Sequence, residues 1–255
     1  MLGFRVQKRV IGALLLREII TRYGRHNIGF LWLFVEPVLF SVGITILWTW
    51  MGAGKGAMTP AGFAVTGYSS LVLWRNMVNR LSGAVPGNIG LLYHRPVKIM
   101  DLLATRGLLE IASVTVSLVV LTIVFTALGL MSLPVDPLLA VSAWLFLCWF
   151  VVGAGLICSY LGATSEVFDR VLNVIMYLTL PLTGAFTMVA WMPPEAQKFL
   201  LLSPLVHCVE MLRAGFFGPG IQPHYSVGFL IQVNSVLLLV GLLLARKIRR
   251  MVVDE

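Results

Sequence analysis

The chain has 255 residues, of which 58% are hydrophobic and only 12% are charged, about half the charged share of an average soluble domain. This composition excludes an ordinary soluble protein, because so few charges cannot cover its surface, and it predicts that lipid solvates much of the chain. The net charge of +8 does not indicate nucleic acid binding, because the basic residues gather near the two ends of the chain, as they do in membrane proteins.

Long uncharged segments predict the membrane-spanning helices. Five segments contain no Asp, Glu, Lys or Arg, and they are 56–74, 111–135, 137–165, 171–194 and 214–245. A sixth segment, 26–54, is interrupted only by Glu36. Each is long enough to cross a hydrocarbon layer of ~30 Å. The sequence therefore predicts an all-α integral membrane protein with a single transmembrane domain over 1–255 and six spans.

Residues 1–25 predict an amphipathic helix that lies on the membrane surface. One face is apolar at helical spacing and carries Leu16, Ile19, Ile20 and Tyr23. The opposite face carries Arg17, Glu18, Thr21, Arg22 and Arg25. This pattern is typical of an interfacial helix on an anionic leaflet. The alternative is a solvated cytoplasmic helix.

The predicted spans follow in chain order at 28–50, 61–83, 108–130, 138–162, 171–191 and 226–245. A cytoplasmic segment, 84–107, separates the second span from the third. Residues 192–224 are rich in Leu, Phe and Met, but their longest uncharged stretch, Phe199–Val209, is too short to span. We expect them to form re-entrant helices on the outer side, shielded by protein where they enter the membrane.

The positive residues predict the orientation. With both termini inside, all but three of the 19 Lys and Arg residues fall on or near the cytoplasmic side. The exceptions are Lys55, Lys198 and Arg213. This bias follows the positive-inside rule, so we expect both ends in the cytoplasm.

Motifs for catalysis or metal binding are not found in the sequence. Gly54-Lys55-Gly56 lacks the first glycine of a phosphate loop at the required spacing and lies in a predicted outside loop. The four histidines are scattered along the chain. We expect no catalytic residue, no metal site and no cofactor bound by this chain, although spacing alone leaves a membrane-embedded Ser–His dyad open.

Among the charges inside predicted spans, Glu36, Arg75 and Arg80 are the most informative. A charge at such depth costs at least ~2.5–3.5 kcal/mol and usually faces a wet cavity or a partner. These residues could line a polar transport path. The alternatives are snorkelling for the two arginines and a structural ion pair for Glu36, with Arg75 as its partner.

The seven tryptophans mostly lie near predicted span ends, and they are Trp32, Trp48, Trp50, Trp74, Trp144, Trp149 and Trp191. One interpretation is an interfacial aromatic belt. The other is a set of stacking platforms for sugar rings, whose C–H faces pack on indoles.

Several motifs resemble a known family. Leu16-Arg17-Glu18-Ile19-Ile20-Thr21-Arg22-Tyr23, Ile28-Gly29-Phe30-Leu31-Trp32 and Glu36-Pro37 resemble the membrane permease of bacterial polysaccharide ABC exporters, the type-2 ABC exporter superfamily. Ser203-Pro204-Leu205, with Glu210 and Arg213 after it, resembles the C-terminal signature of that family. The resemblance covers essentially the whole chain, and the capsular polysaccharide branch fits best.

The resemblance implies a transport permease, without enzymatic activity of its own, in the bacterial inner membrane. Such permeases form homodimers beside two copies of a separate ATPase subunit, which binds ATP and Mg²⁺. They export a lipid-linked acidic polysaccharide, and in capsular systems a periplasmic adaptor and an outer-membrane channel continue the path. No nucleic acid partner is implied.

The resemblance also implies roles for particular residues. The substrate path would include Arg22, Arg25, Trp32, Glu36, Arg75, Arg80 and Tyr177. The ATPase subunit would contact Arg95, Lys98, Asp101 and Arg106. The re-entrant motif would contain Pro204, Glu210 and Arg213.

Pro96 suits the first turn of a short cytoplasmic coupling helix over Val97–Thr105, on which Lys98, Asp101 and Arg106 would be exposed. The alternative is that this helix is the start of the third span.

Other functions remain open from the sequence alone. Within the same class, the chain could export O-antigen or teichoic acid. From a different class, it could be an intramembrane enzyme such as a serine protease or a lipid transferase. An ion-coupled carrier is disfavoured because such proteins usually contain inverted repeats, which the sequence does not show.

Overall fold

The computed structural model describes residues 2–23, 28–50, 58–88, 90, 97–165 and 167–254. All regular structure within these ranges is helical, which confirms the all-α prediction. The long helices are α1 (Leu2–Tyr23), α2 (Ile28–Trp50), α3 (Pro60–Ser82), α5 (Ile99–Ala127), α6 (Pro137–Thr164) and α10 (Val227–Asp254). The shorter ones are α7 (Phe168–Leu178), α8 (Pro194–Leu200) and α9 (Pro204–Phe217), with 3-10 turns η1 (Pro86–Asn88), η2 (Leu180–Thr183), η3 (Val189–Trp191) and η4 (Gly218–Gly220).

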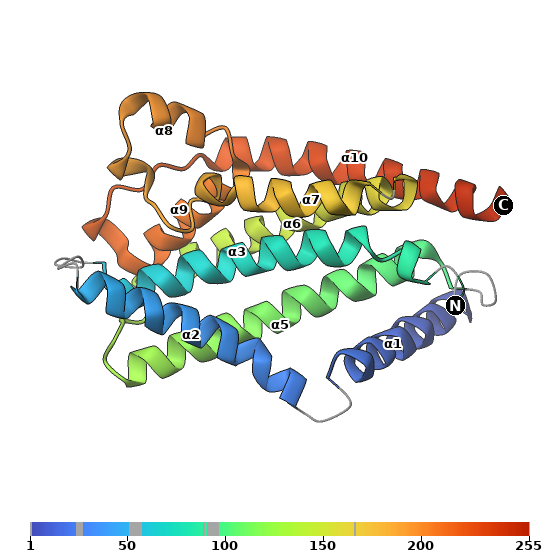
Figure 1. Cartoon of the computed structure of the whole chain (residues 1–255), viewed down its shortest axis with the longest axis horizontal. Coiled ribbons are helices and arrows are strands. Elements are labelled where there is room, and N and C mark those ends of the chain that lie inside the picture. Colours follow the sequence, from blue (N-terminus) through green and yellow to red (C-terminus); the bar gives the residue numbers. More distant parts are fainter. Residues whose placement is uncertain are drawn as a thin grey trace.

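The long helices run along the longest axis of the molecule (Figure 1). The N-terminal end of α1 and the C-terminal end of α10 lie at the same end of this axis, and α8 lies at the opposite end. The two chain termini are therefore on one side of the helical bundle, as an even number of spans requires.

Sequence signals fix where two of the long helices begin. The Thr59 hydroxyl accepts a hydrogen bond of 3.2 Å from the Gly62 N–H, and Pro60 follows as the first residue of α3. The Asp136 carboxylate accepts one of 2.9 Å from the Leu139 N–H at the start of α6. Side chains of this type satisfy donors that a helix leaves free at its N-terminus.

Within the described residues, three helical segments are long and apolar enough to cross a membrane, and they are Ile99–Ala127, Pro137–Thr164 and Val227–Ile248. A fourth results if Pro194–Leu200 and Pro204–Gly220, which meet at 104°, are counted as one bent span. Helices α2 and α3 occupy the positions predicted for the first two spans. The structure thus supports an integral membrane protein, and the count of six spans stays a prediction.

The fifth predicted span, 171–191, differs from the structure. Helix α7 ends at Leu178, and a 3-10 turn and irregular chain follow it. Pro181 cannot donate a backbone hydrogen bond, and Gly184 adopts a left-handed conformation with φ +70°, which favours glycine. A proline and a glycine so close together interrupt the helix that apolar composition alone had indicated.

The cytoplasmic coupling segment also differs from its prediction. Val97–Thr105 was expected to form a short separate helix, but α5 runs without a break from Ile99 to Ala127. The alternative interpretation, that this stretch begins the third span, is therefore the correct one. Residues 91–96, which include Arg95 and Pro96, lie outside the described part of the chain.

Helices α3 and α6 form the centre of the core, and α10 packs along α6. A Cβ atom at Gly153 would lie 2.9 Å from the Leu238 backbone nitrogen, and one at Gly241 would lie 2.8 Å from the Gly153 carbonyl oxygen. Only glycine permits this approach, and small residues at helix crossings are typical of membrane proteins.

Large apolar side chains cover the outside of the bundle, including Val119 and Ile123 of α5, Leu145 of α6 and Leu239 of α10, which are half exposed or more. Such a surface is unfavourable in water but suits the hydrocarbon layer.

Candidate functional site

A charged group lies between α2 and α3. The Arg75 Nη2 atom is 2.9 Å from Oε1 of Glu36, and the Tyr68 hydroxyl donates a hydrogen bond of 2.8 Å to the same oxygen. Tyr68 is buried, whereas the side chains of Arg75 and Glu36 are 41% and 43% exposed. The two charges neutralise each other, as one of our interpretations expected, yet both stay accessible from outside this chain.

An aromatic cavity of about 220 Å³ adjoins this group. Tyr68 belongs to both, because its ring stacks on Phe40 at 4.0 Å between centroids while its hydroxyl binds Glu36. The cavity is lined by Phe40, Ile44, Trp48, Phe63, Ala64, Tyr68, Ala185 and Phe186. Aromatic faces beside a half-exposed ion pair can hold a sugar ring and its polar substituents together.

Two other residues of the predicted substrate path, Tyr177 and Arg80, do not join this cluster. Tyr177 lies on α7 and is 74% exposed. Arg80 lies further along α3 and forms an ion pair of 3.4 Å with Glu110 of α5, so it has a protein partner and does not only snorkel. Arg25 and the side chains of Arg22 and Trp32 lie outside the described part of the structure.

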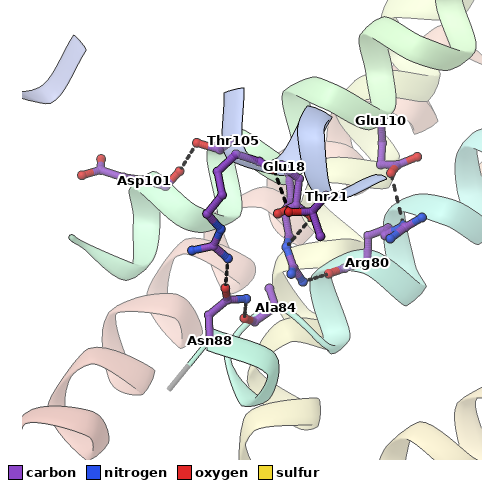
Figure 2. Close-up of polar contacts among 10 residues, drawn as sticks. Glu18, Thr21, Arg80, Ala84, Asn88, Asp101, Thr105 and Glu110 are labelled. Atoms are coloured by element: carbon purple, nitrogen blue, oxygen red, sulfur yellow. Dashed lines mark hydrogen bonds and ion pairs between the residues drawn. The ribbon is translucent and has the colours of Figure 1, made fainter. Parts of the chain in front are cut away.

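A second polar cluster joins α1 to the start of α5 and the end of α3 (Figure 2). Its members are Gln7, Arg17, Glu18, Arg80, Asn88, Asp101, Arg106 and Glu110. Leu14 of α1 is buried beside it, whereas Leu16 and Ile20 are 61% and 57% exposed. Gln7, Arg17 and Glu18 of α1 therefore contact the protein, while Leu16 and Ile20 point outward.

This cluster corrects the exposure expected for two residues that were predicted to contact the ATPase. Asp101 is buried and accepts a hydrogen bond of 2.9 Å from Gln7. The Arg106 side chain is only 16% exposed and forms an ion pair with Glu18. Lys98 is exposed as expected. The prediction of three exposed residues failed because it treated the polar face of α1 as solvated, whereas that face covers two of them.

The segment predicted to be re-entrant holds a third cluster, which surrounds Arg213 of α9. Its guanidinium donates to the carbonyl oxygens of Gly184, Ala185 and Thr187 at 2.8, 2.7 and 2.9 Å, and its Cζ atom lies 3.8 Å from the centroid of the Phe63 ring. Arg213 is fully buried. It fixes the irregular chain after α7 against α3, so three backbone carbonyls of this irregular chain are satisfied by protein.

Glu210 and His207 extend this cluster along the same helix. The Glu210 carboxylate accepts hydrogen bonds of 3.1 Å from the backbone N–H groups of Val189 and His224. His207 accepts 3.0 Å from the Ser226 N–H at Nδ1, so its Nε2 atom carries the proton and donates to the Leu201 carbonyl at 2.9 Å. Pro204 is the first residue of α9. His207 and Glu210 therefore connect α9 to the chain that precedes it, at Val189 and Leu201, and to the chain that follows it, at His224 and Ser226.

Several of these residues were not predicted from the sequence to belong to a functional site. Tyr68, His207 and Glu110 were given no role, although the spacing of His207, Glu210 and Arg213 places them along one face of a helix. An acidic residue at the edge of a predicted span, such as Glu110, is a further signal. Within the described ranges, no group of three or more His, Cys, Asp or Glu side chains is placed to hold a metal ion.

Comparison with known proteins defines the class. The family model for "ABC-2 type transporter" matches residues 9–217, which include most of α1, the charged group on α2 and α3, and helices α8 and α9. The chain belongs to this family, which confirms the prediction made from its motifs.

Individual relatives narrow the class further. The chain is 41% identical to the capsule polysaccharide export inner-membrane protein CtrC of Neisseria meningitidis serogroup B, over 95% of this chain and 92% of the relative. It is 39% identical to the capsule polysaccharide export inner-membrane protein BexB of Haemophilus influenzae, over 94% of this chain and 91% of the relative. It is 31% identical to the polysialic acid transport protein KpsM of Escherichia coli, over 96% and 95%.

Proposed function

We propose that this chain is the membrane subunit of an ATP-driven exporter that moves a lipid-linked, acidic capsular polysaccharide across the bacterial inner membrane. It acts as a homodimer with two copies of a separate ATPase subunit, which binds ATP and Mg²⁺. A periplasmic adaptor and an outer-membrane channel continue the path beyond it.

The observation that carries the proposal is similarity over nearly the whole chain to relatives named for capsule polysaccharide export, at up to 41% identity. The chain and these relatives have almost the same extent, so the likeness is not confined to one segment. The similarity to a polysialic acid transporter supports an acidic substrate, because polysialic acid is a polyanion.

The charged group on α2 and α3 supports a place for the substrate path. Arg75 is half exposed although it lies inside a predicted span, and an arginine at such depth faces water, a carboxylate or an anionic ligand. We propose that Arg75 faces the groove between two copies of the chain. There it attracts the acidic groups of the glycan, while the aromatic cavity beside it packs against sugar rings.

Deletion of the gene tests the proposed function in cells. The polysaccharide should then be lost from the cell surface and accumulate inside, still attached to its lipid, and the intact gene should restore the surface material. Normal surface polysaccharide in the deletion strain would refute the proposal.

The topology is tested by labelling two positions beyond α9. We expect cysteines introduced at Gly220 and Gln222 to react with a membrane-impermeant thiol reagent from the periplasm. Residues 192–224 are predicted to enter the membrane from the periplasmic side and to return to that side without crossing. The three native cysteines should first be replaced, so that the label reports only the new sites. Reaction only from the cytoplasm would overturn the topology.

Docking of the ATPase is tested at Lys98, the exposed basic residue at the start of α5. We expect Lys98→Glu to lower the stimulation of ATP hydrolysis by the membrane subunit about tenfold, the change that corresponds to ~1.4 kcal/mol of lost binding, and to leave membrane insertion intact. Lys198→Glu on exposed α8 is the matched control. Unchanged stimulation in Lys98→Glu would remove Lys98 from the ATPase contact.

A further inference from the structure

Helix α1 contacts both ends of segment 84–107, which are residues 84–88 and 97–107, on either side of the undescribed residues. Asn88 precedes the residues of this segment that lie outside the described part, and Asp101 and Arg106 follow them. The three contacts are Arg17 Nη2 with Asn88 Oδ1, Gln7 Nε2 with Asp101 Oδ1 at 2.9 Å, and Glu18 Oε1 with Arg106 Nε at 3.3 Å. Figure 2 shows Glu18, Asn88 and Asp101 within this cluster.

Arg106 joins three helices at one point. Its Nε atom forms the ion pair with Glu18 of α1, and its Nη1 atom donates to the backbone carbonyl of Arg80 at the end of α3 over 3.1 Å. The side chains of Arg106 and Glu18 are only 16% and 15% exposed. Water and salt therefore screen this pair less than they screen a pair of charges on an exposed surface.

The two faces of α1 differ in what movement they allow. The polar contacts extend from Gln7 to Glu18, which is about 16 Å along a helix, so detaching α1 would break several of them together. The opposite face exposes Leu16, Ile19 and Ile20, and apolar side chains can slide along lipid without losing any hydrogen bond. Helix α1 can therefore move along the lipid together with the rest of the protein more easily than it can detach from the protein.

We propose that Arg106 is a positioning residue that holds α1 against the two ends of segment 84–107, so that α1 and these two ends move as one rigid unit. The inference rests on the proposed function, in which a separate ATPase docks near this segment. Movement of the docked ATPase is then passed directly to α1 through Arg106 and Glu18.

Substitution of Arg106 tests the role in transport. We expect Arg106→Gln to lower export about tenfold while ATP hydrolysis and protein level stay near normal, because the motor still runs but α1 no longer follows it. The paired reversal Glu18→Arg with Arg106→Glu should restore part of the export. Lys198→Gln, which breaks an exposed ion pair with Glu195, is the matched control and should have no effect.

A merely structural role would give a different pattern. Protein level, hydrolysis and export would then fall together in Arg106→Gln. That result, or normal export from Arg106→Gln, would overturn the proposal.

A distance measurement tests the rigid unit without any substrate. Spin labels fit at Gly12 of α1, where an added side chain meets open space, and at Leu108 of α5, which is 54% exposed. The labelled chain, free of other cysteines and diluted with unlabelled chain, is assembled with its ATPase. We expect the same distance without nucleotide and with ATP trapped, and a broader distribution after Arg106→Gln.

A nucleotide-dependent change of more than about 5 Å, one helical turn, would show that α1 moves separately and would refute the rigid unit. Failure of the proposed function appears differently, since the chain would not assemble with the ATPase at all.

Discussion

Replacing Arg75 with alanine is expected to reduce surface capsule about ten- to a hundredfold while the amount of protein in the membrane stays normal. A hydrogen bond to a charged group contributes about 1.5–3 kcal/mol, and this range corresponds to that loss of substrate binding. The expectation follows from the half-exposed position of the Arg75 guanidinium beside the aromatic cavity. Arg75→Lys should restore part of the export, because it keeps the charge but loses the planar fork.

A role for Arg75 in the ion pair with Glu36 alone predicts a different result. If Arg75 served only that pair, Arg75→Ala and Glu36→Gln would each destabilise the protein, and the double change would recover it, because a lone charge is the main penalty. We expect instead that the double variant is present at normal level and still exports poorly. The measurements are surface capsule and detergent-extracted protein for all three variants. Wild-type export from Arg75→Ala would refute both roles.

Replacing Arg213 with leucine is expected to cause the largest loss of stability. The change leaves two buried carbonyl oxygens and one part-buried carbonyl oxygen without donors, and a buried group left without its partner costs about 1–3 kcal/mol. We expect a total of about 4 kcal/mol, which lowers the Tm of a chain of this size by roughly 10 °C. Thermal unfolding of the detergent-purified protein measures the change.

Two variants make the Arg213 result specific. Arg213→Lys should recover only part of the stability, because one ammonium group cannot reproduce the fork that reaches Gly184, Ala185 and Thr187. Arg170→Leu, at an exposed arginine in the first turn of α7, is the control and should leave the Tm within a few degrees. Equal unfolding temperatures for Arg213→Leu and Arg170→Leu would show that the carbonyl contacts contribute little.

The helices that follow one strong pattern could be predicted from the sequence. Helices α2, α3 and α6 begin within a residue of their predicted starts, because an uncharged run between charges or prolines has few ways to fold in a membrane. Helix α7 could not be predicted in the same way, because its composition stays apolar beyond the point where it ends. The break depends on Pro181 together with the left-handed Gly184.

The part of the candidate site that consists of isolated charges within apolar spans could be predicted from the sequence. Glu36 and Arg75 are conspicuous inside apolar spans, so their pairing could be proposed before the structure placed them together. The partners of Arg213 are backbone carbonyls, which leave no signature in the sequence. The contacts of Asp101 and Arg106 were missed for a related reason, since a polar helix face looks the same whether water or protein covers it.

The central claim is that this chain moves polysaccharide across the inner membrane with energy from a separate ATPase, and transport into inverted membrane vesicles tests it most directly. Vesicles that contain this chain and its ATPase subunit are supplied with lipid-linked acidic polysaccharide on their outer, cytoplasmic face. Protection of the polysaccharide from an added glycosidase is then measured with and without ATP. We predict protection only when ATP and both subunits are present, and its loss in Arg75→Ala. Equal protection without ATP or without the ATPase subunit, or none in the complete system, would contradict the account.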